Sequence, residues 1–359
     1  MYVSESFHQR IKKSTLAPGD VVIVRTGKPG TAAVIPDTLP IANCSDLVIV
    51  RPGPQLDSKF LAYYINSAAQ HHVYAHTVGA VQQHFNVGSA KTLKLLKPSL
   101  EEQRAIARIL GALDDKIELN RRMNRTLETI VQALFWSWFV DFEPVCAKRD
   151  GRKPVGMDDT TAALFPEHFQ ETDMGPIPLG WHYGTLADLA RITSGKRPGQ
   201  RSATMTSEMG IPIFGGGGVM GYTDQALCTN KMLLTGRVGT LGLIFRITEP
   251  CWPSDNTLLL TCADRDHEYV YHLIQDVDFD SLNRGSTQPL VTQGDLLALK
   301  VLLPSSEILE KYHAISVNMF NKIDRNKKSI DTLATLRDTL LPQLLSGELR
   351  VGQAEEMIP

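Results

Sequence analysis

The sequence of 359 residues lacks paired cysteines, a marked net charge and long apolar runs. Its five cysteines form no Cys-x-x-Cys pair, which argues against a zinc knuckle or a disulfide framework and fits a reducing compartment. The formal net charge is -2 at pH 7, so any binding to nucleic acid must depend on local basic patches. The N-terminus is polar, and no apolar run approaches the ~18 to 20 residues of a membrane helix. We therefore expect a soluble cytoplasmic protein without a signal peptide.

Signatures of catalysis are also scarce. No GxxxxGK[ST] phosphate loop and no Asn-Pro-Pro-aromatic motif of an amino-methyltransferase occur, and the glycine run 215–218 is interpreted as a loop. The loose acidic candidates, Asp37 and 114–116, do not form the converging carboxylate cluster that a metal-dependent nuclease needs. Three neighbouring histidines have no evident further metal ligand and are interpreted as surface residues: His71, His72 and His76. We expect no catalytic residue, metal site or cofactor in this chain.

An internal repeat organises the sequence. At a shift of 206 residues, Pro98-Ser99 matches Pro304-Ser305 and Asn120 matches Asn326, with further identities up to Leu134 and Leu340. Further upstream the best shift is 209 residues. There the matches are Thr26-Gly27 with Thr235-Gly236, Lys28 with Arg237, Gly30-Thr31 with Gly239-Thr240, and Ser45-Asp46 with Ser254-Asp255. The chain therefore contains two copies of a globular part followed by a long helix.

The two copies differ at their start. Met1 aligns with Gly210, whereas the second copy begins near Ile177. We expect the first globular part to lack a counterpart of 177–209, through a natural truncation or a start codon placed late.

Short β-branched runs and amphipathic segments predict a mixed α/β domain in each copy. Strands are expected at 19–27, 45–52 and 256–262, and final strands at 93–98 and 299–304, each stopped by a proline. Helices are expected at 59–76 and 268–277. The predicted division of the chain is a first domain at 1–97, a helix at 98–142, an extended linker at 143–176, a second domain at 177–303, a helix at 304–350 and a tail at 351–359.

Two long helices are predicted, from about 100 to 140 and from about 306 to 345. Ser99 and Glu102 form a capping box before the first, and Pro342 and Gly347 mark the end of the second. Both helices have a 4-3 spaced coiled-coil seam. In the first helix the seam is Ile106, Leu110, Leu113, Ile117, Asn120, Asn124, Leu127, Val131, Leu134 and Trp138. In the second it is Tyr312, Ser316, Met319, Ile323, Asn326, Ile330, Leu333, Arg337 and Leu340.

Two features of the seam need an explanation. Asn120 and Asn326 share one position, and a buried polar pair there would fix the register of the helices. The aromatic end of the first helix either packs in a core or forms a docking patch: Phe135, Trp136, Trp138 and Phe139. The pattern leaves open whether the helices run parallel or antiparallel.

Recognition of DNA fits this organisation, because two similar domains on a rigid spacer suit two half-sites. Basic and amide side chains on predicted loops are the candidate contacts. In the first domain these are Arg10, Lys12, Lys13, Arg25, Lys28, Gln82 and Gln83. In the second they are Lys196, Arg197, Arg201, Arg237, Arg284 and Gln288, of which the first three lie on the flexible basic loop 193–202.

Three segments carry a resemblance to a known family: "EEQRAIARILGALDDKIELNRRMNRTLETIVQALFWSWFVDFEPV", the "GMDDTTAALFP…IPLGW" junction and "LLPQLLSGELRV". They resemble the specificity (S, or HsdS) subunit of type I restriction-modification enzymes. The resemblance implies two target recognition domains that read a split double-stranded DNA target, and an antiparallel helix pair that sets the gap between the half-sites. It also implies methyltransferase subunits that use S-adenosylmethionine to methylate adenine, and restriction subunits that use ATP and Mg²⁺.

Two alternatives remain at this point. The short first domain is compatible with a truncated scaffold that assembles methyltransferase subunits without reading DNA. A nuclease that uses acids not detected in the sequence is the other.

Overall fold

The computed structural model describes residues 3–39, 41–75 and 85–357. They divide into two compact units. Unit 1 combines Met1–Met123 with Arg325–Pro359, and unit 2 is Asn124–Asp324. Each predicted domain lies in its own unit, but each long helix contributes one half to either unit.

Unit 1 contains a three-stranded antiparallel sheet of order β3-β2-β5, and α2 packs on one of its faces. Val21, Ile23 and Val48 of the sheet are buried against Leu61 and Ile65 of α2. The strands are β1 Thr15–Leu16, β2 Val21–Val24, β3 Ala32–Val34, β4 Ala42–Asn43 and β5 Leu47–Val50. The short helices are α1 Glu5–Arg10, η1 Lys12–Ser14, α2 Ser58–Asn66, α3 Gln70–Ala75, α4 Val87–Lys91 and α11 Val351–Glu356.

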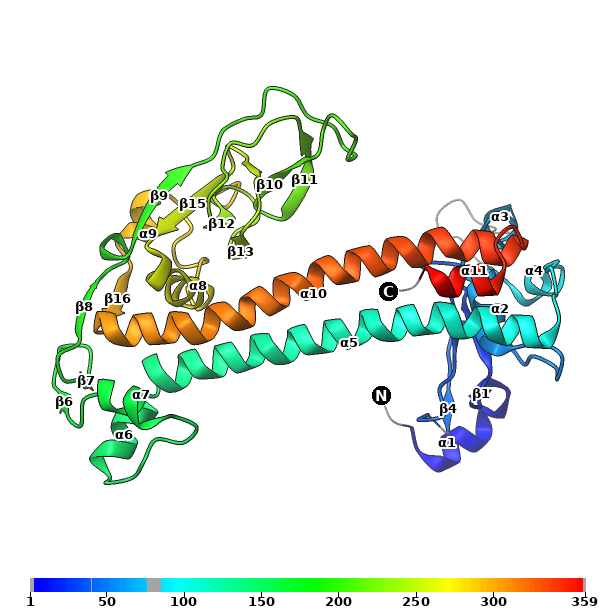
Figure 1. Cartoon of the computed structure of the whole chain (residues 1–359), viewed down its shortest axis with the longest axis horizontal. Helices are drawn as coiled ribbons and strands as arrows, with labels where there is room; N and C mark the ends of the chain where they lie inside the picture. Colours follow the sequence, from blue (N-terminus) through cyan, green and yellow to red (C-terminus); the bar gives the residue numbers. More distant parts are fainter. Residues whose placement is uncertain (1–2, 40, 76–84, 358–359) are drawn as a thin grey trace. The chain divides into compact units, whose positions relative to one another are not determined.

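Unit 2 contains a four-stranded antiparallel sheet of order β13-β12-β15-β9, with the smaller sheets β11-β10-β14, β16-β8 and β6-β7 (Figure 1). The strands are β6 Phe169–Gln170, β7 Ile177–Pro178, β8 His182–Thr185, β9 Ala190–Ser194, β10 Ile211–Gly215, β11 Gly218–Thr223, β12 Met232–Gly236, β13 Ile244–Ile247, β14 Trp252–Pro253, β15 Thr257–Cys262 and β16 Lys300–Leu303. The short helices are α6 Glu143–Arg149, α7 Asp159–Leu164, η2 Leu186–Asp188, η3 Asp264–Asp266, α8 His267–Gln275 and α9 Gln293–Leu297.

The repeat predicted from the sequence is present in the fold. A central strand lies between two antiparallel neighbours in both sheets, β3-β2-β5 and β13-β12-β15. The helix that follows has 9 residues in both units and lies at the expected shift of 209 residues, α2 at 58–66 and α8 at 267–275. The pair α4 and α9 likewise keeps the shift of 206. The prediction of two repeated mixed α/β domains is therefore confirmed.

One predicted strand is wrong. Residues 93–98 have no regular secondary structure, whereas the corresponding segment of unit 2 is β16. β16 is a strand because it pairs with β8 at 182–185. In the described part of unit 1, 93–98 pairs with no strand.

Two other predicted segments differ from the structure: one predicted helix is interrupted, and the predicted linker contains helices. The helix predicted at 59–76 is interrupted, and Ala69 N instead bonds to Tyr64 O at 3.0 Å between α2 and α3. The predicted extended linker 143–176 carries α6 and α7. α6 has Pro144 in its first turn and buries Val145, while the carboxylate of Asp158 caps α7 by accepting from Thr161 N.

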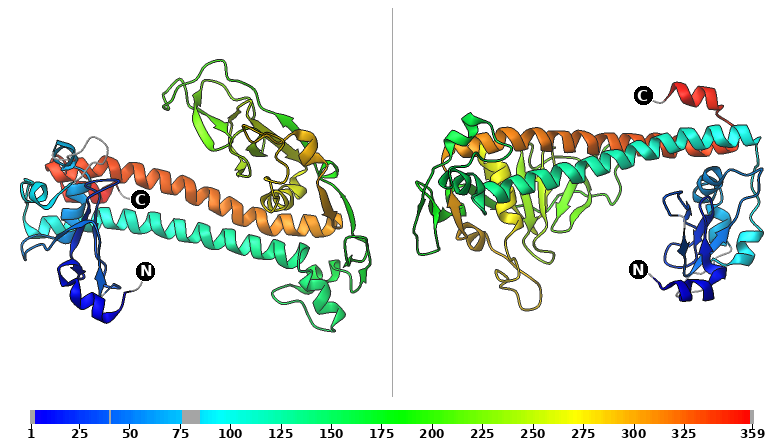
Figure 2. Two further views of the ribbon diagram at one scale, coloured as in Figure 1. Left: turned by 180° about the vertical axis from the view of Figure 1, so that it is seen from behind. Right: turned by 90° about the horizontal axis from the view of Figure 1, so that it is seen from below.

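The long helices lie close to their predicted bounds. α5 is Leu100–Phe139 and α10 is Ser306–Ser346, and Figure 2 shows both as continuous helices. Ser99 Oγ accepts from Glu102 N at 3.2 Å, as half of a capping box would, but the Glu102 carboxylate lies 3.7 Å from Arg350. Gly347 ends α10 with φ +79°.

The segment predicted as a tail, 351–359, contains a helix, α11. Its helix α11 buries Ala354 in the same cluster as Leu110 and Leu340 of unit 1, and Glu355 pairs with Arg108. Within the described ranges, no helix is both long enough and apolar enough to cross a membrane.

Candidate nucleic-acid interface

Several loops leave one end of the four-stranded sheet of unit 2. β9 ends and β15 begins at this end, because Ser194 pairs with Leu258. β12 ends there as well, since Gly236 pairs with Thr257. The loops 195–210, 237–243 and 254–256 therefore all lie at the same end of the sheet.

A fourth loop, 283–291, joins this set through main-chain hydrogen bonds. Val291 N donates to Arg237 O at 3.0 Å, and Gly239 N donates to Pro289 O at 2.9 Å. The loop itself is held by the side chain of Asn283, which accepts from Gly285 N and Leu290 N. We call the four loops together the loop face of unit 2. All six candidate residues of the second domain lie on it.

A cleft of about 500 Å³ opens in the loop face. Arg197 and Arg201 line it from one loop, and Asp255 and Asn256 line it from another. All four side chains are exposed at the rim. Ser254 lies in the wall, is 2% exposed, and its hydroxyl has no hydrogen-bond partner among the described protein atoms. The rim of the cleft therefore carries two cations, one carboxylate and one amide, with the buried, unsatisfied hydroxyl of Ser254 in its wall.

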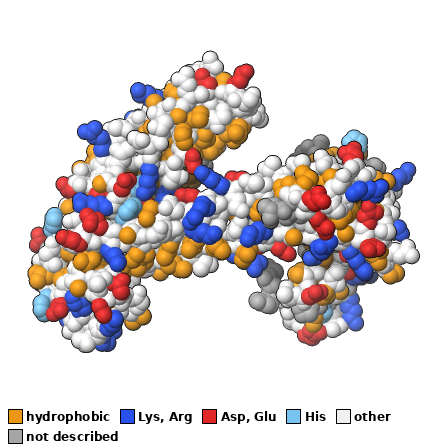
Figure 3. Space-filling model, in the orientation of Figure 1, with side chains coloured by type: hydrophobic (Ala, Val, Ile, Leu, Met, Phe, Trp, Pro, Cys, Tyr) orange, Lys and Arg blue, Asp and Glu red, His pale blue; other side chains and the backbone are white. Residues whose placement is uncertain are grey.

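An apolar patch adjoins the cleft. Met220 on β11 belongs to the cleft lining and is 53% exposed, and the preceding residue, Val219, is exposed as well. Figure 3 shows this patch in orange on the flank where β10, β11 and β13 lie. Apolar side chains next to arginines suit contact with bases and sugars as well as with phosphates.

The basic loop 193–202 is anchored at its base, so the prediction of a flexible loop is wrong there. Lys196 N donates to Pro253 O at 3.0 Å, and the indole of Trp252 donates to Lys196 O at 2.7 Å. A Cβ at Gly195 would lie 2.1 Å from Ser254 O, so a glycine is required for this close approach. Lys196, Arg197 and Arg201 nevertheless remain exposed beyond the anchor.

The two candidates on the fourth loop differ. Arg284 is exposed but donates to the Asp295 carboxylate at 2.7 Å. This hydrogen bond, together with those from Thr292, lowers the pKa of Asp295, which also completes the capping box of α9. Arg284 thus has a structural partner, whereas Gln288 is exposed.

In unit 1 the candidates lie on several elements. Arg10 is on α1, Lys12 and Lys13 are on η1, and these side chains are exposed, as is Lys28 in the β2–β3 loop. Arg25 lies 3.7 Å from Asp46. Gln82 and Gln83 lie outside the described residues.

The β2–β3 and β12–β13 loops correspond residue by residue, but at a different shift from the one that the sequence suggested. The pairs Val21–Val34 and Leu233–Arg246 occupy the same place in the two sheets, which sets a shift of 212 residues. Both loops then read Arg-x-Gly-x-x-Gly, from Arg25 and from Arg237.

The glycine conformations agree with this register. Gly27 and Gly239 have φ +82° and +83°, and Gly30 and Gly242 have φ +85° and +79°. The matches at 209 of Thr26-Gly27 with Thr235-Gly236 and of Lys28 with Arg237 are therefore wrong. For β5 and β15 the shift is 210, because Val21–Val50 corresponds to Leu233–Leu260. Asp46 then corresponds to Asn256 rather than to Asp255.

The predicted seam is buried in both units, and the helices run antiparallel. In unit 1, α5 and α10 share a cluster that contains Ile106, Leu113, Ile117, Leu333 and Leu340. Arg337 donates to Asp114 at 2.7 Å, and the amide of Asn120 donates to Ser329 Oγ at 3.2 Å. Asn326 is buried too, at 3% exposure. The partner that the structure gives Asn120 is thus Ser329, not the expected Asn326.

In unit 2 the seam continues through Ile323, with Leu127 and Leu134 partly buried beside it. Asn124 donates to the main-chain carbonyl of Ile323 at 3.4 Å, which gives this seam asparagine a role. Three of the four aromatic residues lie in the core: Phe135, Trp138 and Phe139. There the ring of Phe139 packs edge-on against the rings of Tyr269 and Tyr312. Trp136 is 40% exposed. Core packing therefore explains the aromatic end except for Trp136.

A buried ionic network attaches the α/β domain of unit 2 to α10. Glu268 on α8 is fully buried and contacts Lys231 at 2.7 Å, His313 at 2.6 Å and Arg246 at 3.4 Å. Burial alone would raise the pKa of the Glu268 carboxyl, but its interactions with His267 and Lys231 outweigh burial and lower it. Arg246 also stacks 3.8 Å from the ring centre of Phe320.

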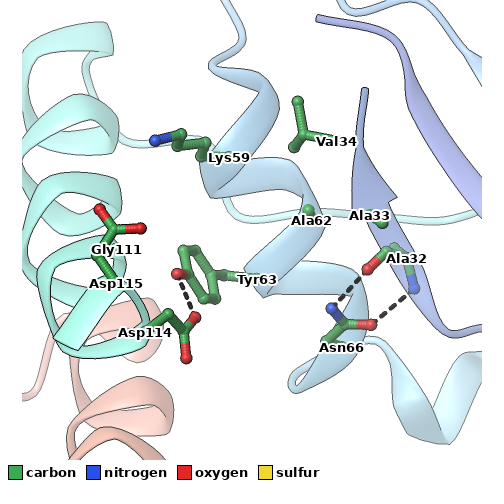
Figure 4. Close-up of a pocket in the computed structure, with 10 residues that line it drawn as sticks. All are labelled: Ala32, Ala33, Val34, Lys59, Ala62, Tyr63, Asn66, Gly111, Asp114 and Asp115. Atoms are coloured by element: carbon green, nitrogen blue, oxygen red, sulfur yellow. Dashed lines mark hydrogen bonds between the residues drawn. The ribbon is translucent and has the colours of Figure 1, made fainter. Parts of the chain in front are cut away.

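In unit 1 a pocket occupies the place that corresponds to the ionic network around Glu268. At the shifts given above, Lys59 corresponds to Glu268 and Val34 to Arg246, and both line a pocket of about 260 Å³ beside α5. Figure 4 shows the Tyr63 hydroxyl donating to Asp114 at 2.6 Å across this pocket. The two α/β domains are therefore attached to their long helices by different side chains.

Sequence reasoning missed Asp46, Ser254 and Asn256, and the ionic network around Glu268. The recurrence of Arg-x-Gly-x-x-Gly at a shift of 212 is the signal that would have led to the first and third. Nothing in the sequence marks the partners of Glu268, since they come from three distant elements. In the described part of the chain, no group of three or more His, Cys, Asp or Glu side chains is placed to hold a metal ion.

Comparison with known proteins gives one consistent result. The family model described as type I restriction modification DNA specificity domain matches residues 2–129 and 178–335. The specificity subunit of the type I restriction enzyme HindI from Haemophilus influenzae is 27% identical, over 73% of this chain and 70% of that protein. The MjaIX specificity subunit of Methanocaldococcus jannaschii is 26% identical, over 73% of this chain and 62% of that protein.

A solved structure supports the fold. The crystal structure of a type I restriction-modification S subunit from M. genitalium superposes with a TM-score of 0.62 at 19% identity, covering 93% of this chain and 84% of that one. The two family matches coincide with the two repeats, and each includes most of the long helix that follows. The chain accordingly belongs to the family of type I restriction-modification DNA specificity subunits, and its role is DNA recognition rather than catalysis.

Proposed function

We propose that this chain reads a bipartite DNA target, with one half-site for each recognition domain, and directs adenine methylation and restriction by partner subunits. The observation that carries the proposal is the repeat of one α/β recognition domain, each copy packed on one half of an antiparallel helix pair. Two similar readers on one chain suit two half-sites. The relatives named above are specificity subunits of type I restriction enzymes, which agrees with this function.

The helices are proposed to set the gap between the half-sites. α5 has 40 residues and α10 has 41, which corresponds to about 60 Å for a straight helix. The buried asparagines and the Asp114–Arg337 pair favour a single register of the helices, and a spacer needs one.

Methyltransferase subunits that bind S-adenosylmethionine, and restriction subunits that use ATP and Mg²⁺, are the proposed partners. Exposed apolar side chains at the end of α5 in unit 2 support a docking surface there: Ile130 and Trp136 on the helix and Val140 directly after it, each at least 40% exposed. Apolar residues in this number in one segment favour a protein partner. Because the proposed substrate is cellular and incoming DNA, the proposed site of action is the cytoplasm.

The decisive experiment expresses the chain with its methyltransferase subunit and maps methylated adenines in the genomic DNA of the host. A split motif with a fixed gap is the expected result. Assembly of the two subunits without any methylated motif would contradict the proposal and favour the scaffold without DNA recognition. Cleavage of DNA by this chain alone with Mg²⁺ would favour the nuclease.

A further inference from the structure

The two Arg-x-Gly-x-x-Gly loops hold their arginine next to different residues. Arg25 N donates to Asp46 O at 3.4 Å, and Arg237 N donates to Asn256 O at 2.8 Å. The arginines therefore occupy one position of the repeat, and Asp46 and Asn256 occupy the neighbouring one. The strand ladders align these positions, although the backbone differs there: Asp46 has φ +58°, and Asn256 does not share this left-handed conformation.

In unit 1 the arginine is neutralised. The Arg25 guanidinium lies 3.7 Å from the Asp46 carboxylate, and Asp46 also accepts from the Thr26 hydroxyl. The side chains are 35% and 41% exposed, so the pair contributes little to stability. It still places a negative charge beside the guanidinium.

In unit 2 the corresponding arginine keeps its charge. Asn256 replaces the carboxylate by a neutral amide, and Arg237 forms no ion pair or side-chain hydrogen bond with any residue in the described ranges. Arg237 is partly exposed. It lies on the loop face, beside the wall of the cleft that contains Arg197 and Arg201.

We propose that Arg237 is a DNA-contacting residue of the second recognition domain, whereas Asp46 withholds Arg25 from DNA in the first. The residue at the position of Asp46 and Asn256 decides whether the loop arginine engages the nucleic acid. The two half-site readers thus use one loop in two ways. The inference rests on the proposed reading of DNA and adds a residue that determines affinity and base choice.

The test compares Asn256→Asp, Arg237→Ala and the double variant, each as the full chain assembled with its methyltransferase subunits. The probe is a duplex that carries the split motif found by methylation mapping, and affinity is measured at several salt concentrations. Each single variant is expected to weaken binding about tenfold, the size of one good arginine contact. The double variant is expected to bind no more weakly than Arg237→Ala, because both changes remove the same contact.

Two controls separate this contact from general charge effects. Asn230→Asp adds the same charge in the exposed segment before β12, at the opposite end of that strand, and should change affinity much less. Asp46→Asn in unit 1 should release Arg25 and strengthen binding, and this gain should vanish when Arg25→Ala is added. Asparagine suits that position, because Asp46 has φ +58° and asparagine tolerates this conformation.

The outcomes are distinct. Unchanged affinity of Asn256→Asp, or a double variant whose loss is the sum of the single losses, overturns the inference and leaves the proposed function intact. A complex of the unaltered chain that binds no split target overturns both. Melting curves of Asn256→Asp that match those of the unaltered chain confirm that a loss of affinity is not a loss of fold.

Discussion

The amide of Asn120 on α5 donates to the hydroxyl of Ser329 on α10 at 3.2 Å, inside the helix pair of unit 1. Asn120 is 6% exposed, whereas Ser329 is only partly buried and can bond to water. Asn120→Leu is therefore expected to raise the stability of the chain by about 1 kcal/mol, since an apolar group replaces a buried amide whose partner can be resolvated.

Chemical unfolding of the full chain measures this change. Ser329→Ala, which removes the acceptor of the buried Asn120 amide, should instead lower stability by about 1 kcal/mol. A loss of several kcal/mol in Asn120→Leu would show that the asparagine belongs to a fully satisfied network instead.

The pair of Asp114 with Arg337 should hold the first recognition domain to both helices, because the Tyr63 hydroxyl bonds to the same carboxylate. Asp114→Ala is expected to cost about 1 kcal/mol, a modest figure because the pair is partly exposed. Asp115→Ala is the control, since Asp115 lines the same pocket but is exposed. Equal effects of the two variants in urea unfolding would contradict this role of Asp114.

Glu268→Gln should have a larger effect, confined to unit 2. The change leaves Lys231 and Arg246 without their buried counter-charge, and a loss of about 3 kcal/mol is expected. Fluorescence of Trp138 and Trp181, which lie in the core of unit 2, reports on unfolding. Lys59→Met, at the corresponding position of unit 1, should have little effect on that signal.

His272 predicts a dependence on pH. Burial lowers the pKa of His272 from 6.5 to about 4, so the folded state resists a proton that the unfolded chain accepts. Because the folded pKa is depressed, protonation favours unfolding, and stability is lost as pH falls from 6.5 towards 4. His272→Phe should reduce the loss between pH 7.5 and pH 5 by about 2 kcal/mol. A stability difference between these pH values that is the same in both proteins would refute this assignment.

Removing one heptad from each long helix, 121–127 from α5 and 321–327 from α10, should shorten the gap of the split target. Seven residues correspond to about 10 Å of helix, or about three base pairs. Methylation mapping measures the gap. An unchanged motif in a complex that still methylates DNA would refute the spacer role of the helices.

The sequence predicted the elements that depend on local patterns. The heptad seam set α5 and α10, and the apolar periodicity set α8, correctly to within a few residues, whereas the helix predicted at 59–76 is divided into α2 and α3. Residues 93–98 could not be predicted in this way, because an apolar run becomes a strand only beside a partner, and β16 has β8 while 93–98 has none in the described part of unit 1.

The register of the repeat shows a second limit. Thr26-Gly27 matches Thr235-Gly236 by identity, yet the ladder of β2 and β3 aligns Arg25 with Arg237. In the second copy, Thr235-Gly236 and Val238-Gly239 lie three residues apart, and the first of them matches Thr26-Gly27 better by identity. Only the hydrogen bonds between strands show that the shift of 212, and not 209, is correct here. Basic charge was visible in the sequence, but its neutralisation was not, because Asp46 and Asp295 lie 21 and 11 residues away from Arg25 and Arg284.

The division of unit 1 between the two ends of the chain has a consequence for biosynthesis. Unit 2 is a continuous segment, so all of its residues are synthesised before the second half of α10. Leu110 and Leu113 of unit 1 must wait for Leu340, Leu344 and Ala354 before their shared core can close. The domain that is translated first is therefore completed last. A chain that ends near residue 324 would contain all residues of the second recognition domain but would lack part of the core of unit 1.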